Sequence, residues 1–172
     1  MKNKGTLAKW FKWGSVVFAT IVTLLLIYGC ILYKSIQNDK TKGFDESRKI
    51  IFSETDITDA DEMFAFYGEE AFHILFGKTN TNEEKIAFFP LDHDGGITVI
   101  DQTKIISKEA IEQTWKKRCS NCHLINIAPA MIDDQPLWEM TYKDDRAKYV
   151  IDYLSMDDGS RYERYSFKQR FN

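Results

Sequence analysis

An internal duplication is the feature that most constrains how this chain can fold. The segment EEAFHILFGKTNTNEEKIAFFPLDHDGG at 69–96 aligns with DQPLWEMTYKDDRAKYVIDYLSMDDGS at 134–160, and the alignment places Lys78 on Lys143. A period of about 65 residues is longer than that of the units of solenoid proteins. The duplication therefore predicts two small domains in tandem.

Both copies alternate apolar or aromatic residues with polar ones, at the period of two that is typical of strands. The predicted strands of the first copy lie near 61–67, 71–78, 85–90 and 97–101, and those of the second near 124–131, 136–143, 148–155 and 162–167. The sequences DHDGG and DDGS predict tight turns that join neighbouring strands into hairpins.

One helix is predicted before each set of strands, at about 44–55 and at 107–119. In the second helix Ser107 suits the N-cap, and the basic residues at 116–118 suit the last turn. Each copy is thus predicted to be an α+β unit, with a helix packed on one face of an antiparallel sheet. Because a unit of about 60 residues has only a marginal core, we expect the two units to share an interface.

A long uncharged segment precedes the duplication. Residues 1–12 carry four lysines and no acid, and Gly14–Tyr33 contains 20 residues without a charge. A helix of that length spans about 30 Å, the thickness of the hydrocarbon core of a bilayer. We predict a basic cytoplasmic tail at 1–12 and a transmembrane helix at 13–33. Since lysines favour the cytoplasmic side, the rest of the chain is expected to be extracytoplasmic, in a single-pass protein of the cell membrane.

Cys30 offers an alternative anchor in the same segment. Gly29-Cys30 resembles the end of a lipobox, in which Cys30 would accept a lipid, although the apolar run continues beyond it. A cleaved signal peptide fits the segment less well, because its apolar core is shorter. A membrane helix and a lipid would both tether the chain to a membrane.

The part of the chain that follows the apolar segment is acidic. Residues 34–172 contain 19 Lys and Arg against 26 Asp and Glu, a balance of −7, whereas the whole chain carries −3. Because proteins that bind nucleic acid present a basic surface to the phosphates, this balance argues against nucleic acid as a partner.

The sequence CSNCH at 119–123 has the Cys-x-x-Cys-His spacing of c-type haem attachment. Haem would use Cys119, Cys122 and His123, and a thiol redox site would use the two cysteines. Both alternatives are weakened because the motif ends a predicted helix and leads into strands, whereas reactive cysteine pairs favour helix N-termini. Zinc would need a fourth ligand. We favour a structural role, in which the cysteines pack under the helix or form a disulfide between Cys119 and Cys122.

No other pattern in the sequence indicates catalysis. The chain lacks a glycine-rich phosphate loop, a nucleophile elbow and a His-Glu-x-x-His motif. His73 aligns with Trp138 of the second copy, which favours packing or a surface position. His93 lies in an acidic turn that lacks the further ligands of a calcium loop. We therefore predict a protein that is not an enzyme and holds no cofactor or metal.

These motifs together resemble the TseB/YpmB family of cell wall elongation regulators, which have one membrane helix and two cystatin-like (PepSY-like) domains. The resemblance rests on the apolar segment ending LYKS, on ISKEAI before the second helix, and on PLWEMTYKD followed by YLSMDDG. It implies a first cystatin-like domain at 34–102 and a second at 103–172. The CSNCH motif departs from the family pattern, so no role is carried over to it.

The resemblance implies a non-enzymatic membrane protein that regulates peptidoglycan synthesis during elongation by contacting a class B penicillin-binding protein. The sheets of such units have edges and concave faces that can take up a strand or loop of a partner. Aromatic residues of the FFP and LWEMTY strands are the candidate anchors for that contact: Phe88, Phe89, Trp138 and Tyr142. A PepSY-type inhibitor of an extracellular protease is an alternative function.

Overall fold

The computed structural model describes residues 13–14, 18–33, 41–92 and 95–168. The chain divides into two compact units, Met1–Lys42 and Gly43–Asn172, which are described separately. The predicted cytoplasmic tail lies outside the described residues, and so does part of the predicted membrane helix, at 15–17.

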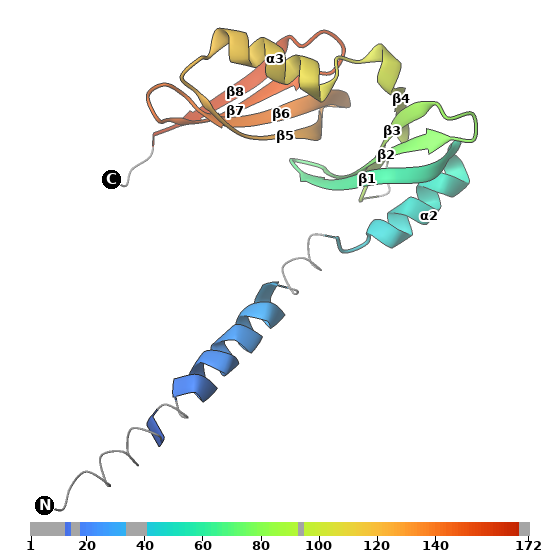
Figure 1. Ribbon diagram of the computed structural model, residues 1–172. Coiled ribbons are helices and arrows are strands. Elements are labelled where there is room, and N and C mark those ends of the chain that lie inside the picture. The colour runs from blue at the N-terminus through green and yellow to red at the C-terminus, as the bar shows by residue number, and fades with distance from the viewer. Residues whose placement is uncertain (1–12, 15–17, 34–40, 93–94, 169–172) are drawn as a thin grey trace, which may run out of the picture. The chain divides into compact units, whose positions relative to one another are not determined.

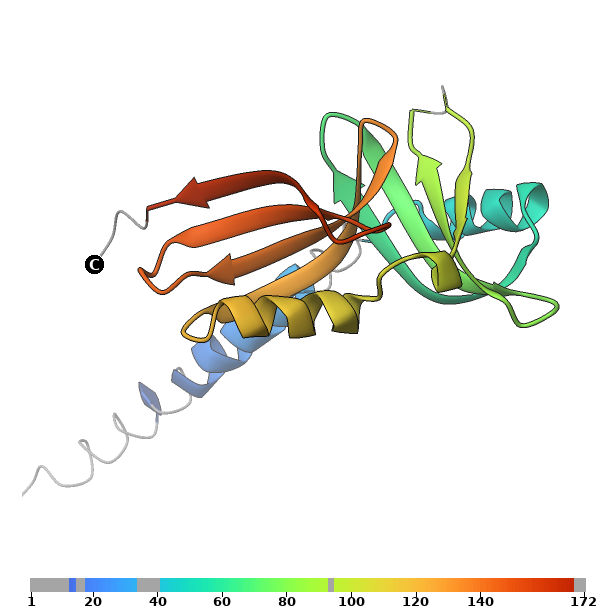
Figure 2. The same cartoon turned by 90° about the horizontal axis from the view of Figure 1, so that it is seen from above.

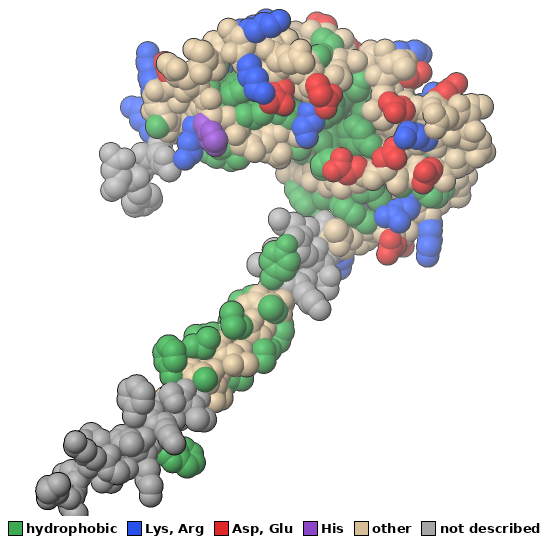
Figure 3. Space-filling model, in the orientation of Figure 1, with side chains coloured by type: hydrophobic (Ala, Val, Ile, Leu, Met, Phe, Trp, Pro, Cys, Tyr) green, Lys and Arg blue, Asp and Glu red, His purple; other side chains and the backbone are tan. Residues whose placement is uncertain are grey.

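The first unit is helical at 13–14 and 18–33. Large apolar side chains such as Phe18 and Leu25 are exposed on it, and hydrophobic side chains cover much of the helix in Figure 3. Within the described residues, no helix has both the length and the apolar character needed to cross a membrane.

The second unit has the predicted α+β class and contains two antiparallel four-stranded sheets (Figure 1). The first sheet follows helix α2 (Phe44–Glu54) and has the strand order β1-β2-β3-β4. Its strands are β1 (Ile57–Tyr67), β2 (Ala71–Thr79), β3 (Glu84–Pro90) and β4 (Thr98–Asp101).

The second sheet repeats this arrangement. The short 3₁₀ helix η1 (Gln102–Lys104) and helix α3 (Lys108–Arg118) lead into strands in the order β5-β6-β7-β8. These strands are β5 (His123–Ile132), β6 (Gln135–Lys143), β7 (Tyr149–Ser155) and β8 (Arg161–Phe167). Ser107 caps α3 as predicted, because its side chain accepts a hydrogen bond from the backbone N–H of Ala110. Figures 1 and 2 show α3 along one face of this sheet.

Most predicted element boundaries agree with the structure to within two residues, but β1 starts four residues earlier than the predicted strand at 61–67. The pairing of β1 with β2 shifts register between Ile57 and Asp59 and again between Ala60 and Glu62. Each shift interrupts the alternation of faces along the strand. A search for a regular period of two therefore misses the first residues of β1 in the sequence.

The central strands of the first sheet are buried on both faces. On one face, under α2, a compact cluster contains Ile51, Ile57, Leu75, Ala87 and Phe89. The opposite face contributes to a larger core, whose members from this sheet include Phe72, Ile74, Ile86 and Phe88. A strand covered on both sides reads as an almost continuous apolar run, as AFHILF does.

The larger core draws on both sheets, as the marginal size of each unit led us to expect. From the second half of the chain it includes Ile111 of α3, Ile127 of β5 and Trp138 of β6. Phe76 of β2 stacks on Trp138, with ring centroids 6.3 Å apart and planes inclined by 29°. Because both sheets belong to one compact unit, the division into separate domains at 102 and 103 stays a prediction.

Candidate functional site

The four aromatic residues predicted as partner contacts lie inside the folded unit. The exposed fraction is 0 % for Phe88, 5 % for Phe89, 3 % for Trp138 and 4 % for Tyr142. Phe88 and Trp138 belong to the core shared by the two sheets, and Phe89 lies under α2. Phe88 and Phe89 are both buried because β3 is covered on both faces, whereas Trp138 and Tyr142 share the face of β6 that contributes to the larger core. All four are core residues, and Tyr142 also lines the cavity described below.

His73 has the packing role that its alignment with Trp138 favoured. It is 3 % exposed, its Nδ1 lies 2.7 Å from the hydroxyl of Ser47 in α2, and its ring packs edge-on against Phe44. Burial lowers the pKa of His73 below its ordinary value, because removal from water disfavours the charged imidazolium. The neutral ring thus joins α2 to the first sheet.

The CSNCH motif occupies the connection between α3 and β5. Cys119 is the C-cap of α3, and a disulfide joins it to Cys122. His123 begins β5 and its side chain is exposed. With both sulfurs bonded to each other, the motif fixes the end of the helix beside the first residues of the sheet. The haem and thiol redox alternatives stay untested predictions.

Metal ligation has no support within the described residues, where no group of three or more His, Cys, Asp or Glu side chains is placed to hold an ion. This applies to the zinc site weighed for CSNCH, since Cys119, Cys122 and His123 do not form such a group in the part of the chain that the structure describes.

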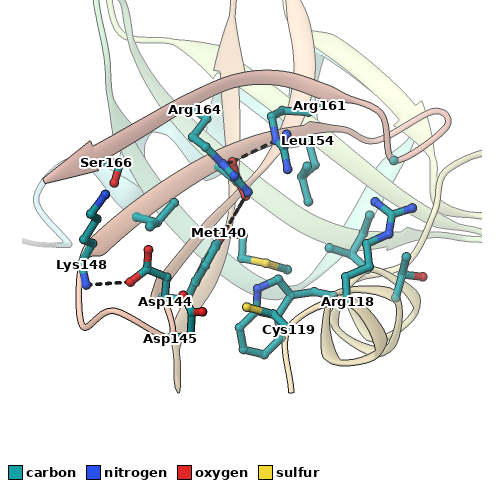
Figure 4. A pocket seen from close by; sticks show the side chains of 17 residues that line it. Arg118, Cys119, Met140, Asp144, Asp145, Lys148, Leu154, Arg161, Arg164 and Ser166 are labelled. Carbon is teal, nitrogen blue, oxygen red and sulfur yellow. Dashed lines mark hydrogen bonds and ion pairs between the residues drawn. The ribbon is translucent and has the colours of Figure 1, made fainter. Parts of the chain in front are cut away.

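A cavity of about 490 Å³ lies between α3 and the strands β6, β7 and β8. Trp115 of α3, Met140 and Tyr142 of β6, and Leu154 of β7 give it an apolar and aromatic lining. The ring of Trp115 packs edge-on against that of Tyr142 at a centroid distance of 5.3 Å. Charged side chains from the helix, from β8 and from the turn between β6 and β7 complete the lining (Figure 4).

A buried carboxylate organises the floor of the cavity. Asp152 is 3 % exposed, and Arg164 binds it in a bidentate manner, with Nε 2.5 Å from Oδ1 and Nη2 2.6 Å from Oδ2. Arg161 places its Nε 3.1 Å from the same Oδ1. The hydroxyl of Tyr142 donates to Oδ2 at 2.9 Å. Two guanidinium groups therefore share one carboxylate, which leaves this cluster with a positive charge.

The pKa shifts in this cluster follow from its contacts. Burial and the hydrogen bond to Asp152 raise the pKa of Tyr142 to about 12. The hydrogen bond to Asp152 also raises the pKa of Arg164 above its ordinary value. Both groups therefore stay protonated at neutral pH, and the network persists across the physiological range.

Sequence reasoning missed this cluster because Arg161 and Arg164 are three residues apart, a spacing that places side chains on opposite faces of a regular strand. In the structure, Tyr153 pairs with Glu163 while Leu154 pairs with Arg161, so β8 contains one extra residue at this point. The bulge turns both arginines toward Asp152. The sequence offers one signal for this cluster. Asp152 interrupts the mostly apolar strand YVIDYLS, and the next strand, RYERYSF, contains two arginines.

Comparison with known proteins agrees with the family resemblance. The family described as "Cell wall elongation regulator TseB-like domain" matches residues 46–90. A curated relative, the "Probable cell wall elongation regulator TseB" of Bacillus subtilis (strain 168), is 24 % identical over 154 residues, which cover 84 % of this chain and 90 % of the relative. The chain is TseB/YpmB-like.

A solved structure supports the same fold. The "YpmB protein from Bacillus subtilis" superimposes with a TM-score of 0.68 at 20 % identity, over 73 % of this chain and 98 % of that one. The predicted TseB/YpmB-like resemblance is therefore confirmed by sequence and by fold.

Proposed function

We propose that this TseB/YpmB-like protein regulates cell wall elongation, and that it does so as a non-enzymatic binding module. The observation that carries the proposal is the similarity to the "Probable cell wall elongation regulator TseB", which extends over 84 % of the chain and thus reaches into both sheets. The match of residues 46–90 to the TseB-like domain supports it independently.

The proposed partner is a class B penicillin-binding protein in the same membrane. The uncharged segment Gly14–Tyr33 would anchor the chain, and the folded unit at 43–172 would contact the partner outside the cytoplasm. A shared membrane raises the effective concentration of two anchored proteins, so a modest contact between folded units is sufficient for association.

Crosslinking in membranes tests this proposal. The tagged full-length chain, crosslinked in cells and purified with detergent, is expected to recover a class B penicillin-binding protein by mass spectrometry. A matched control that carries only residues 1–42 and the tag identifies proteins that co-purify through the apolar segment without the folded unit. Recovery of no wall-synthesis protein, or equal recovery with the control, would refute the proposed contact. Protease treatment of intact cells that spares the folded unit would refute its extracytoplasmic location.

A further inference from the structure

The cavity beneath α3 has unlike ends. At one end Lys148 lies with Asp144 and Asp145 of the turn between β6 and β7, so the net charge of these three residues is negative. At the other end lie Arg161 of β8 and Arg118 of α3, which Figure 4 shows on the opposite side of the cavity from that turn. Among the described residues, Arg118 has no carboxylate partner. We propose that this end of the cavity binds the carboxylate of a peptide.

Arg161 is prepared for such a ligand. Its Nε contacts Asp152, and its side chain is 49 % exposed. Arg164 already neutralises Asp152 through two short hydrogen bonds, so the charge of Arg161 is not cancelled at this site. None of the described residues supplies an acceptor for the two terminal amino groups of Arg161. A guanidinium held at Nε presents these groups as a fork, which matches the two oxygens of a carboxylate.

A singly charged anion suits this arrangement better than phosphate. Two uncancelled arginines face one end of the cavity, but Asp144 and Asp145 line the other end and would repel a second negative charge. The lining also includes Trp115, Met140 and Leu154, which would pack against apolar atoms of the ligand. The volume of about 490 Å³ lies within the range of small-ligand sites and exceeds what a bare carboxylate needs.

The ring of Trp115 contributes apolar surface to the same wall, where it packs edge-on against Tyr142. The ligand is therefore expected to combine a carboxylate with apolar side chains, as a short peptide does.

The carboxylate could come from an acidic side chain or from a free chain end, and two probes separate these sources. The first is a fluorescein-labelled peptide of leucine and glutamine that contains a single glutamate and has a blocked C-terminus. The second alternates leucine and glutamine and has a free C-terminus. The reference peptide has leucine and glutamine with a blocked end. Fluorescence anisotropy with the full-length chain in detergent micelles is expected to show at least tenfold tighter binding of one or both carboxylate peptides than of the reference.

Variants show whether binding occurs in this cavity. Arg161→Gln and Arg118→Gln are each expected to weaken binding of the carboxylate peptide at least tenfold. Lys117→Gln is the matched control, because it removes one positive charge from the same helix at a position that does not line the cavity. Circular dichroism and thermal unfolding verify that each variant folds.

Three outcomes would overturn the inference. The carboxylate peptides could bind no better than the blocked neutral peptide. Lys117→Gln could weaken binding as much as Arg118→Gln, which would indicate general attraction to basic surface. Sodium phosphate could displace the peptide more effectively than sodium acetate at equal ionic strength, which would contradict selection of a carboxylate. The inference does not depend on which protein supplies the peptide, so failure of the crosslinking experiment would leave it standing.

Discussion

At the scale of single residues, His73 links the folding of the first sheet to pH. The ring is buried between α2 and β2, where it lies 2.7 Å from the hydroxyl of Ser47. Burial lowers its pKa in the folded state, whereas in the unfolded chain the pKa returns to about 6.5. Below that value the unfolded chain binds more protons than the folded chain, so the free energy of unfolding falls as pH decreases toward the folded pKa.

We therefore expect urea unfolding to show lower stability at pH 5.5 than at pH 7.5. In His73→Gln, whose side-chain amide still reaches Ser47 but does not titrate, this part of the pH dependence is expected to disappear. The carboxylates that titrate at lower pH serve as an internal control, because their contribution is common to both proteins. An equal loss of stability in the variant would contradict the assignment of the effect to His73.

Gly77 is a position where even the Cβ atom of an alanine would disturb the packing of the first sheet. A Cβ there would overlap the backbone carbonyl oxygen of Asp59 and would lie 2.8 Å from Cγ2 of Ile57, in the irregular part of the β1–β2 pairing. Gly77→Ala is expected to lower the free energy of unfolding by about 2 kcal/mol, the usual cost of overpacking. Gly96→Ala is the control in the same unit, because a Cβ added there would meet no described atom within 4 Å. Chemical denaturation that finds the two variants equally stable would refute this explanation.

At the scale of elements, the disulfide limits how the C-terminal end of α3 can move relative to β5. It joins residues only three positions apart, so it closes a loop of about four residues. In the chain-entropy description such a loop stabilises the folded state by about 2 kcal/mol at most. The effect is local, because Cys119 belongs to the lining of the cavity while Cys122 packs beside the larger core.

Reduction is therefore expected to lower the thermal midpoint by a few degrees without unfolding the protein. The double variant Cys119→Ser with Cys122→Ser is expected to have the lower thermal midpoint even without reductant. Adding reductant should not change its midpoint further. Thermal unfolding followed by circular dichroism, with and without reductant, measures both. A response of the double variant to reductant would show that the effect has another source.

The sequence predicted elements well where a local pattern determines them. Alternation located most strands, and Ser107 with the following basic residues located α3, because each signal is contained within a few neighbouring residues. Sequence-based prediction failed where contacts between distant segments determine which residues are buried. Phe88 and Phe89 lie on opposite faces of β3 and are both buried, since one face meets α2 and the other meets the shared core. Likewise the cluster around Asp152 depends on a bulge in β8 that no short pattern encodes.

At the scale of the whole unit, the two copies of the duplicated pattern depend on one another. Phe72, Ile74 and Phe88 of the first sheet belong to the same buried cluster as Trp138 and Met140 of the second. Neither sheet therefore completes this core alone. Since small units of about 60 residues bury too little apolar surface for ample stability, the shared core is expected to make the two sheets unfold together.

The positions of the tryptophans make this cooperativity measurable. The chain has four tryptophans, and replacing Trp10 and Trp13 by phenylalanine leaves Trp115 of α3 and Trp138 of β6, whose fluorescence reports on the second half of the folded unit. Phe88→Ala, at a residue with no exposed surface in the first sheet, is expected to cost about 3–5 kcal/mol. The denaturation midpoint seen by tryptophan fluorescence should fall together with the midpoint seen by circular dichroism.

The control is Phe18→Ala, at an exposed position of the first unit, which should leave both midpoints unchanged. If Phe88→Ala left the fluorescence midpoint in place, or if residues 103–172 alone showed a sharp thermal transition, the two sheets would be independent domains.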